Sequence, residues 1–454
     1  MSQKKCILIT VSLFLSASLF AQVLIKDISF QEALQQAKAA DKIVLLLIES
    51  AECNQCNEVA MQGFSNQILG RSVNTSCITV KVSPGSKNFG TVDSLFTIGS
   101  SFGLLFINAE GDLLHRYSAS SSYYITYMEQ LDKALNRKEH PDAEFKQLQN
   151  EYTNGKRDFE LLYKLVAKKN EWDFEHDQLT EEMVTVAPND SSASLTFLQF
   201  IAVQAPVIDS KAFQYMRKDN RNFNDAWFLM NLQKRIAANN KIIFKSKSKA
   251  IKEKNSSYAE KVANFSAGIQ TDRTQSRKSH DRNMIDFYKG ISDTSSFLLA
   301  SVKYYDQYLM TIRVDSVQRV DSMRRRDMFA YAVPDRVTQA SGSKVLMRSS
   351  PYAPMTQNFT NELNDGAWTI YIYTHDLFYM AKALSWAKRA TEFYENPAAI
   401  DTYARLLYRT GNREEAVNWE EKAIQLTKTR RMPASEFEEV ISKMKSGINT
   451  IDKY

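Results

Sequence analysis

Hydrophobic positions between residues 22 and 140 alternate between helical spacing and short apolar runs. Within 30–40 the apolar side chains recur every three or four residues, which predicts a helix. Residues 43–48, Ile-Val-Leu-Leu-Leu-Ile, form a continuous run that is typical of a strand buried on both faces. More strands are predicted at 77–82, 104–107 and 112–117, the last two joined by a turn at 108–111. Strands that alternate with helices, plus one hairpin, predict an α/β or α+β layer architecture.

From residue 144 onward the apolar positions follow helical spacing almost throughout. Residues 243–284 are polar and rich in lysine, which favours a solvated helix face or a loop over a binding patch. Residues 333–357 hold three prolines and many serines, which indicates a loop or linker. Helices are predicted at 144–152, 157–169, 173–185, 191–204, 209–217, 222–242, 287–326 and from about 358 to the C-terminus.

The clearest repeat pattern lies at 396–429. Its small and apolar residues resemble those of a tetratricopeptide repeat in their spacing: Ala404, Leu407, Gly411, Ala416 and Ala423. Small side chains let two antiparallel helices approach closely, and a glycine permits the turn between them. A plain helical bundle is the alternative for this region.

Residues 1–21 have the layout of a secretory signal peptide. Lys4 and Lys5 precede a short apolar stretch that ends near the small residue Ala21. The stretch is shorter than the roughly 20 residues of a spanning helix, so a membrane anchor is the less favoured alternative. No second apolar run of spanning length follows. We therefore expect a periplasmic or otherwise exported protein that is soluble after cleavage and has no membrane span.

Composition excludes several classes of protein. The chain has 454 residues with only 14 Gly and 9 Pro, which disfavours an all-β protein full of tight turns. The net charge of +6 is too small for this length to indicate a nucleic-acid partner. Phosphate-binding, dinucleotide-binding and hydrolase motifs do not occur where their contexts require them, so we expect no cofactor.

Cysteine placement suggests the candidate chemistry. Cys53 and Cys56 form a C-x-x-C that follows a predicted buried strand and precedes a predicted helix. The N-terminus of a helix stabilises a thiolate, so Cys53 would be the catalytic nucleophile and Cys56 the resolving thiol. One alternative is a structural disulfide, and another is half of a zinc site. A complete zinc site would need a second Cys or His pair, and none lies close in sequence, so we expect no metal site. Cys77, in an apolar strand, is expected to be an inert core thiol.

At these residues the chain resembles the thioredoxin family, especially secreted bacterial thioredoxin-like domains that precede tetratricopeptide-like helices. Residues 42–56 are similar to the strand and C-x-x-C of that family, and 104–116 to its later hairpin. The resemblance implies an α/β thioredoxin-like N-terminal domain followed by a mostly α-helical, tetratricopeptide-like region. The expected divisions are a signal peptide at 1–21, a thioredoxin-like domain at 22–140, a helical region at 141–332, a linker at 333–357 and a tetratricopeptide-like domain at 358–454.

Three positions depart from the family's pattern. Glu52 stands where the family carries a tryptophan, Leu47 where it often has a buried aspartate, and Phe102 where it has a cis-proline. A carboxylate beside the nucleophile should raise its pKa. Without the buried aspartate, resolution should be slower unless Glu49, Glu52 or Glu58 substitutes.

Two functions are compatible with this pattern. The first is an exported thiol–disulfide oxidoreductase whose helical repeats recruit a protein client or a redox partner protein. The second is a non-catalytic protein-binding scaffold in which Cys53 and Cys56 form a structural disulfide, and whose helices hold a peptide or partner.

Overall fold

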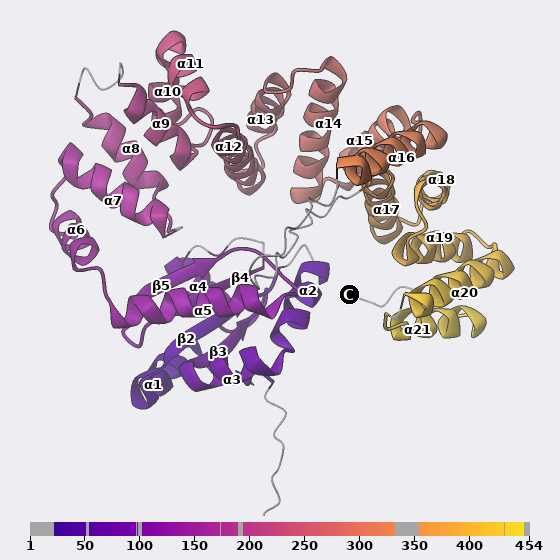
Figure 1. The fold of residues 1–454 in the computed structure, drawn as a ribbon, viewed down its shortest axis with the longest axis horizontal. Coiled ribbons are helices and arrows are strands. Elements are labelled where there is room, and N and C mark those ends of the chain that lie inside the picture. The colour runs from indigo at the N-terminus through magenta and orange to yellow at the C-terminus, as the bar shows by residue number, and fades with distance from the viewer. Residues whose placement is uncertain are drawn as a thin grey trace, which may run out of the picture. The chain divides into compact units, whose positions relative to one another are not determined.

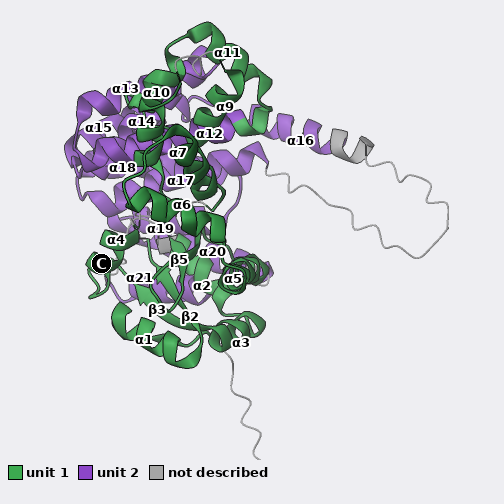
Figure 2. Cartoon of the chain, turned by 90° about the vertical axis from the view of Figure 1, so that its left-hand side faces the viewer, with its two compact units in different colours: residues 1–234 green, residues 235–454 purple. Residues whose placement is uncertain are grey.

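A computed structural model describes residues 22–50, 54–96, 98, 102–172, 174–188, 194–331, 354–430 and 432–448. The expected signal peptide, Glu52, Cys53 and most of the expected linker lie outside these residues. The chain divides into two compact units, residues 1–234 and 235–454, and the division falls within helix α12 (Leu232–Lys252) (Figure 2).

A five-stranded sheet organises the N-terminal part of the first unit (Figure 1). The strand order is β1-β3-β2-β4-β5, with β1 and β2 parallel to β3, and with β4 antiparallel to β2 and β5. The strands are β1 (Ile25–Lys26), β2 (Ile43–Ile48), β3 (Cys77–Val82), β4 (Gly103–Ile107) and β5 (Leu113–Tyr117). The predicted strands are therefore confirmed.

Alternate residues of β2 contribute to two hydrophobic clusters. Ile43, Leu45 and Leu47 pack with α2 (Asn54–Phe64), α3 (Gln67–Ser76) and α5 (Tyr124–Glu139). The intervening residues of β2 pack with α1 (Phe30–Ala40) and α4 (Phe89–Phe96). Successive side chains of a strand point to opposite faces, so a continuous apolar run supplies both layers.

The predicted hairpin turn between β4 and β5 is also confirmed. The side-chain oxygen of Asn108 accepts hydrogen bonds from the backbone N–H groups of Glu110 and Asp112, at 3.1 and 2.7 Å. Gly111 has a φ of 95°, a backbone angle that residues other than glycine rarely adopt. Asparagine and glycine at these positions therefore reverse the chain within four residues.

In the part of the first unit that the structure describes, six further helices share one hydrophobic cluster. They are α6 (Ala143–Thr153), α7 (Phe159–Glu171), α8 (Asp177–Thr185), α9 (Leu195–Gln204), α10 (Lys211–Arg217) and α11 (Asn220–Leu229). The predicted single helix at 222–242 is wrong, because α11 and α12 are separate. Met230 is extended between them, and the side chain of Asn231 accepts a hydrogen bond from the N–H of Lys234 at 2.8 Å.

The described residues of the second unit form helices and their connections. Besides α12 it contains α13 (Ser256–Gly268), α14 (Arg273–Gly290), α15 (Thr294–Tyr308), α16 (Val314–Tyr331), α17 (Met355–Tyr373), α18 (Leu377–Phe393), α19 (Pro397–Arg409), α20 (Arg413–Thr429) and α21 (Ser435–Lys445). The lysine-rich stretch 243–284 is therefore mostly helix rather than loop. Among the residues that the structure describes, no helix combines the length and the apolar character needed to cross a bilayer.

Helices α19 and α20 pack against each other at the position of the repeat pattern. Gly411, with a φ of 97°, lies in the turn between them. Ala404, Ala416 and Ala423 are fully buried. Their small side chains fit the close approach that the spacing predicts, while the assignment to a tetratricopeptide repeat stays a prediction.

Candidate functional site

Cys56 is the third residue of α2, the helix that follows the buried strand β2. Its side chain is partly buried and packs against the same cluster as Ala60 and Phe64, which follow it at four-residue intervals on one helix face. The sulfur of Cys56 is disulfide-bonded. Cys53 precedes α2 in the sequence but lies outside the described residues, so its pairing with Cys56 stays a prediction.

Asn57 ties the end of the strand segment to the first turn of α2. Its side-chain oxygen accepts a hydrogen bond from the N–H of Ser50 at 2.8 Å, and its amide donates to the Ser50 carbonyl at 3.0 Å. Ser50 is buried, so its backbone groups need these partners. The sequence pattern alone did not point to Asn57, although an asparagine in the first turn of a helix is a recognisable signal for such a role.

Leu47 and Phe102, two of the positions that depart from the thioredoxin family's pattern, belong to the hydrophobic cluster against which Cys56 packs. Leu47, on β2, and Phe102, just before β4, are both almost completely buried in this cluster. Each supplies an apolar side chain where the resembled family has an aspartate or a proline. Neither side chain carries a titratable group.

The carboxylates proposed as substitutes for the family's aspartate are differently placed. Glu49 forms an ion pair with Lys81 at 2.6 Å and accepts a hydrogen bond from the Ser83 hydroxyl at 2.6 Å. A proton carrier at this position would first have to release these partners. Glu58 is exposed on α2, and Glu52 lies outside the described residues.

A close approach between α2 and α5 positions the helix that carries Cys56. A Cβ added at Gly63 would lie 2.5 Å from the ring of Tyr127 and 2.7 Å from the carbonyl oxygen of Ser121. The hydroxyl of Tyr127 accepts a hydrogen bond from the N–H of Ser121 at 2.7 Å, and burial raises the pKa of Tyr127 to about 12. Only glycine at position 63 leaves room for this packing.

Cys77 is buried in the core, as the sequence predicts, and its lack of reactivity stays a prediction. It begins β3, is 4% exposed and is a free thiol. Burial raises the pKa of Cys77 to about 12, because a thiolate would lose its hydration there. It is therefore almost entirely protonated near neutral pH and is a poor nucleophile.

Comparison with solved structures gives a partial similarity. No protein-family model and no curated protein matches the chain. A solution structure described as that of "a putative disulphide-isomerase from Bacteroides thetaiotaomicron" is 19% identical, and the match covers 27% of this chain and 96% of that one, with a TM-score of 0.23. We draw no conclusion about activity from a similarity of this size.

Proposed function

We propose that this protein is an exported thiol–disulfide oxidoreductase in which Cys53 and Cys56 form the redox pair. The observation that carries the proposal is the disulfide-bonded sulfur of Cys56 in the first turn of the helix after a fully buried strand. The layered sheet supports it, because residues 22–140 contain the strands and the hairpin that the resemblance to a thioredoxin-like domain implies. The helices of 141–332 and 358–454 would recruit a protein client or a redox partner.

The reaction would use two exchanges at sulfur. The thiolate of Cys53 attacks one sulfur of a client disulfide, which breaks that bond and releases the other client sulfur as a thiolate. The thiolate of Cys56 then attacks the Cys53 sulfur in the mixed disulfide and releases the second client thiolate. Two electrons pass from the cysteine pair to the client, and the reverse sequence oxidises a client.

The apolar surroundings of Cys56 predict which exchange is slower. Leu47 and Phe102 pack in the cluster around Cys56, and an apolar setting disfavours a thiolate. Formation of the mixed disulfide at Cys53 would therefore outpace its resolution by Cys56. We expect mixed disulfides with clients to persist long enough for isolation from the wild-type protein.

The reduction potential of the mature protein tests the proposal. Thiol trapping against glutathione or dithiothreitol should give a value between roughly −120 and −270 mV, the range of exchange proteins. A potential below about −300 mV would indicate a structural disulfide. That result would refute the proposal in favour of the protein-binding scaffold.

Matched cysteine variants locate the activity. Cys53→Ala should abolish reduction of a test disulfide, and Cys56→Ala should accumulate mixed disulfides with clients. Cys77→Ala is the control and should retain exchange, since Cys77 is buried and protonated. Equal activity of Cys53→Ala and the wild type would contradict the assignment.

A further inference from the structure

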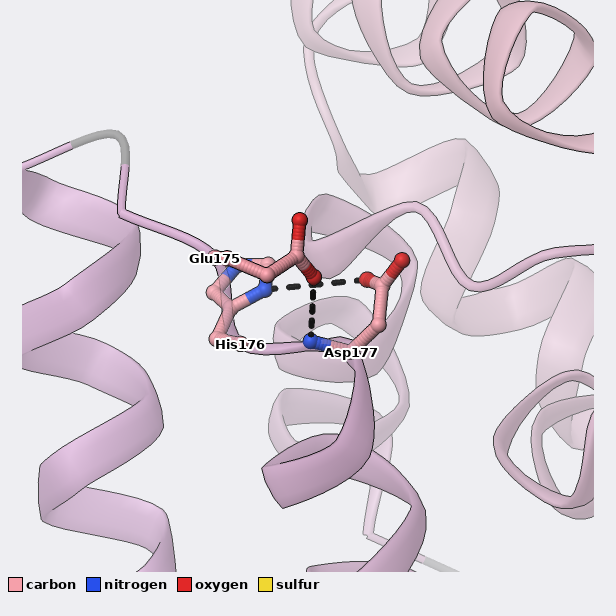
Figure 3. A group of neighbouring side chains, drawn as sticks. All are labelled: Glu175, His176 and Asp177. Atoms are coloured by element: carbon pink, nitrogen blue, oxygen red, sulfur yellow. Dashed lines mark hydrogen bonds and ion pairs between the residues drawn. The ribbon is translucent and has the colours of Figure 1, made fainter. Parts of the chain in front are cut away.

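The loop that follows α7 and the first residue of α8 bring one imidazole and two carboxylates together (Figure 3). Glu175, His176 and Asp177 each present one ligand atom, and these atoms all lie within 4.8 Å of one another. Glu175 is exposed, Asp177 is the partly buried first residue of α8, and His176 is buried. The group belongs to the first unit and is far in sequence from the cysteine pair.

Among the described residues, one nitrogen of the His176 imidazole has a hydrogen-bond partner and the other has none. His176 is 4% exposed. Its Nε2 lies 3.3 Å from the side-chain oxygen of Asn170, while its Nδ1 has no hydrogen-bond partner among the described residues. Nδ1 lies instead 3.8 Å from a carboxylate oxygen of Asp177, beyond hydrogen-bonding distance.

A buried polar nitrogen without a hydrogen-bond partner costs free energy, so a ligand that binds to Nδ1 would remove this cost. Donation from Nε2–H to Asn170 would leave the lone pair of Nδ1 exposed to the two carboxylates. This is the arrangement of a metal-binding histidine, in which an outer hydrogen bond sets the tautomer and the orientation of the ring.

We propose that Glu175, His176 and Asp177 form a binding site for a first-row divalent transition metal ion such as Zn²⁺. One imidazole nitrogen with two carboxylate oxygens suits such ions better than Ca²⁺ or Mg²⁺, which prefer oxygen ligands throughout. Two ligands about 2.1 Å from one ion are at most about 4.2 Å apart. The 3.8 Å between His176 and Asp177 already meets this limit, and the exposed side chain of Glu175 can rotate to meet it.

Helix capping explains only part of the cluster. A carboxylate oxygen of Glu175 accepts a hydrogen bond from the N–H of Asp177 at 3.0 Å, as acidic residues commonly do at the start of a helix. This contact accounts for Glu175 but leaves Nδ1 of His176 without a partner.

The charge of the site allows a cation. Lys169 lies close, with its Nζ donating to the backbone carbonyl of Glu175 at 3.2 Å, and burial lowers the pKa of Lys169. With Lys169 protonated, two carboxylates and a neutral imidazole leave a net charge of −1. A cavity of about 300 Å³, lined by all three proposed ligands, leaves room for water at the remaining coordination positions.

Equilibrium dialysis with Zn²⁺ on the full mature chain tests the site. Cys53 and Cys56 are kept oxidised so that their thiolates do not compete for the metal. We expect one ion per chain, bound at least ten-fold more weakly by Glu175→Gln and by Asp177→Asn. Both substitutions retain the size of a side chain that is exposed or partly exposed, so the fold should persist. His140→Gln, a change at an exposed histidine, is the control and should bind Zn²⁺ as the wild type does.

Two further measurements distinguish this site from adventitious binding and from metal capture by the cysteine pair. Asn170→Ala keeps all three ligands but removes the outer hydrogen bond, and should weaken binding about ten-fold or more. The double variant Cys53→Ala, Cys56→Ala should bind one ion as before, whether or not the proposed redox function holds. Equal binding by the wild type and the Glu175 and Asp177 variants would show adventitious binding and overturn the proposal. Absence of Zn²⁺ binding would overturn it as well.

Discussion

Glu420 provides a sharp test of how burial controls ionisation in the second unit. It lies on α20 and is fully buried, and neither carboxylate oxygen finds a hydrogen-bond donor among the described residues. Asp401 and Arg405, on α19, lie beside it, with Nε of Arg405 donating to Asp401 at 2.8 Å. Burial, together with the neighbouring Asp401 carboxylate, raises the pKa of Glu420 to about 9. Glu420 therefore carries a proton at neutral pH and can donate it to Asp401.

This proton links the stability of the fold to pH. The pKa of Glu420 is raised from 4.5 to about 9, so the folded chain binds a proton where the unfolded chain does not. The stabilisation is fully present below about pH 4.5 and is lost as the pH rises towards 9. Each pH unit in this window decreases the free energy of unfolding by up to about 1.4 kcal/mol.

Glu420→Gln replaces the proton with a permanent amide donor of the same size. We expect the variant to match the wild type near pH 5 and to unfold on the order of 10 °C higher near pH 8, from the usual conversion of stability into Tm. Thermal unfolding followed by circular dichroism at several pH values measures this difference. Glu421→Gln is the matched control, because Glu421 is 55% exposed in an ion pair with Lys445 and should show no such pH dependence. A Tm difference for Glu420→Gln that does not change with pH would refute the reasoning.

Three further predictions concern the first unit. Gly63→Ala should reduce stability by about 1–3 kcal/mol through its clash with Tyr127, whereas Gly90→Ala, which meets no neighbour, should be nearly neutral in the same denaturant titration. Cys77 should resist iodoacetamide at about pH 8 in the folded protein and react once unfolded, as mass spectrometry would reveal, because burial raises its pKa to about 12. Rapid labelling of the folded chain would contradict that pKa. Asn57→Ala removes two hydrogen bonds from the loop before α2 and should reduce stability by about 1–3 kcal/mol, measured by urea unfolding; an unchanged transition midpoint would show that the loop does not need them.

Local features of the fold could be predicted from the sequence because each is recorded within a few neighbouring residues. The apolar run of β2 identifies a strand buried on both faces, and Asn108 with Gly111 identifies a hairpin turn. The break between α11 and α12 escaped prediction because neither Gly nor Pro interrupts the helical spacing there. Only the extended backbone of Met230 and the capping side chain of Asn231 reveal it.

The candidate sites differ in the same way: some features follow from neighbouring residues in the sequence, and others only from the folded structure. The sequence alone identifies the C-x-x-C of Cys53 and Cys56 and the apolar setting of Cys77, since both depend on adjacent residues. It also contains Glu175, His176 and Asp177 in succession. It does not show that the imidazole is buried, with one nitrogen that has no hydrogen-bond partner in the described part of the chain.

Tertiary structure alone decided which distant groups meet. Gly63 contacts Tyr127 across two helices, and Glu420 lies beside Asp401 on a neighbouring helix. Hydrophobic periodicity records which face of an element is buried, but not which element covers it. Electrostatics and close packing depend on that covering partner, so the raised pKa of Glu420 and the requirement for glycine at position 63 arise only when the chain is folded.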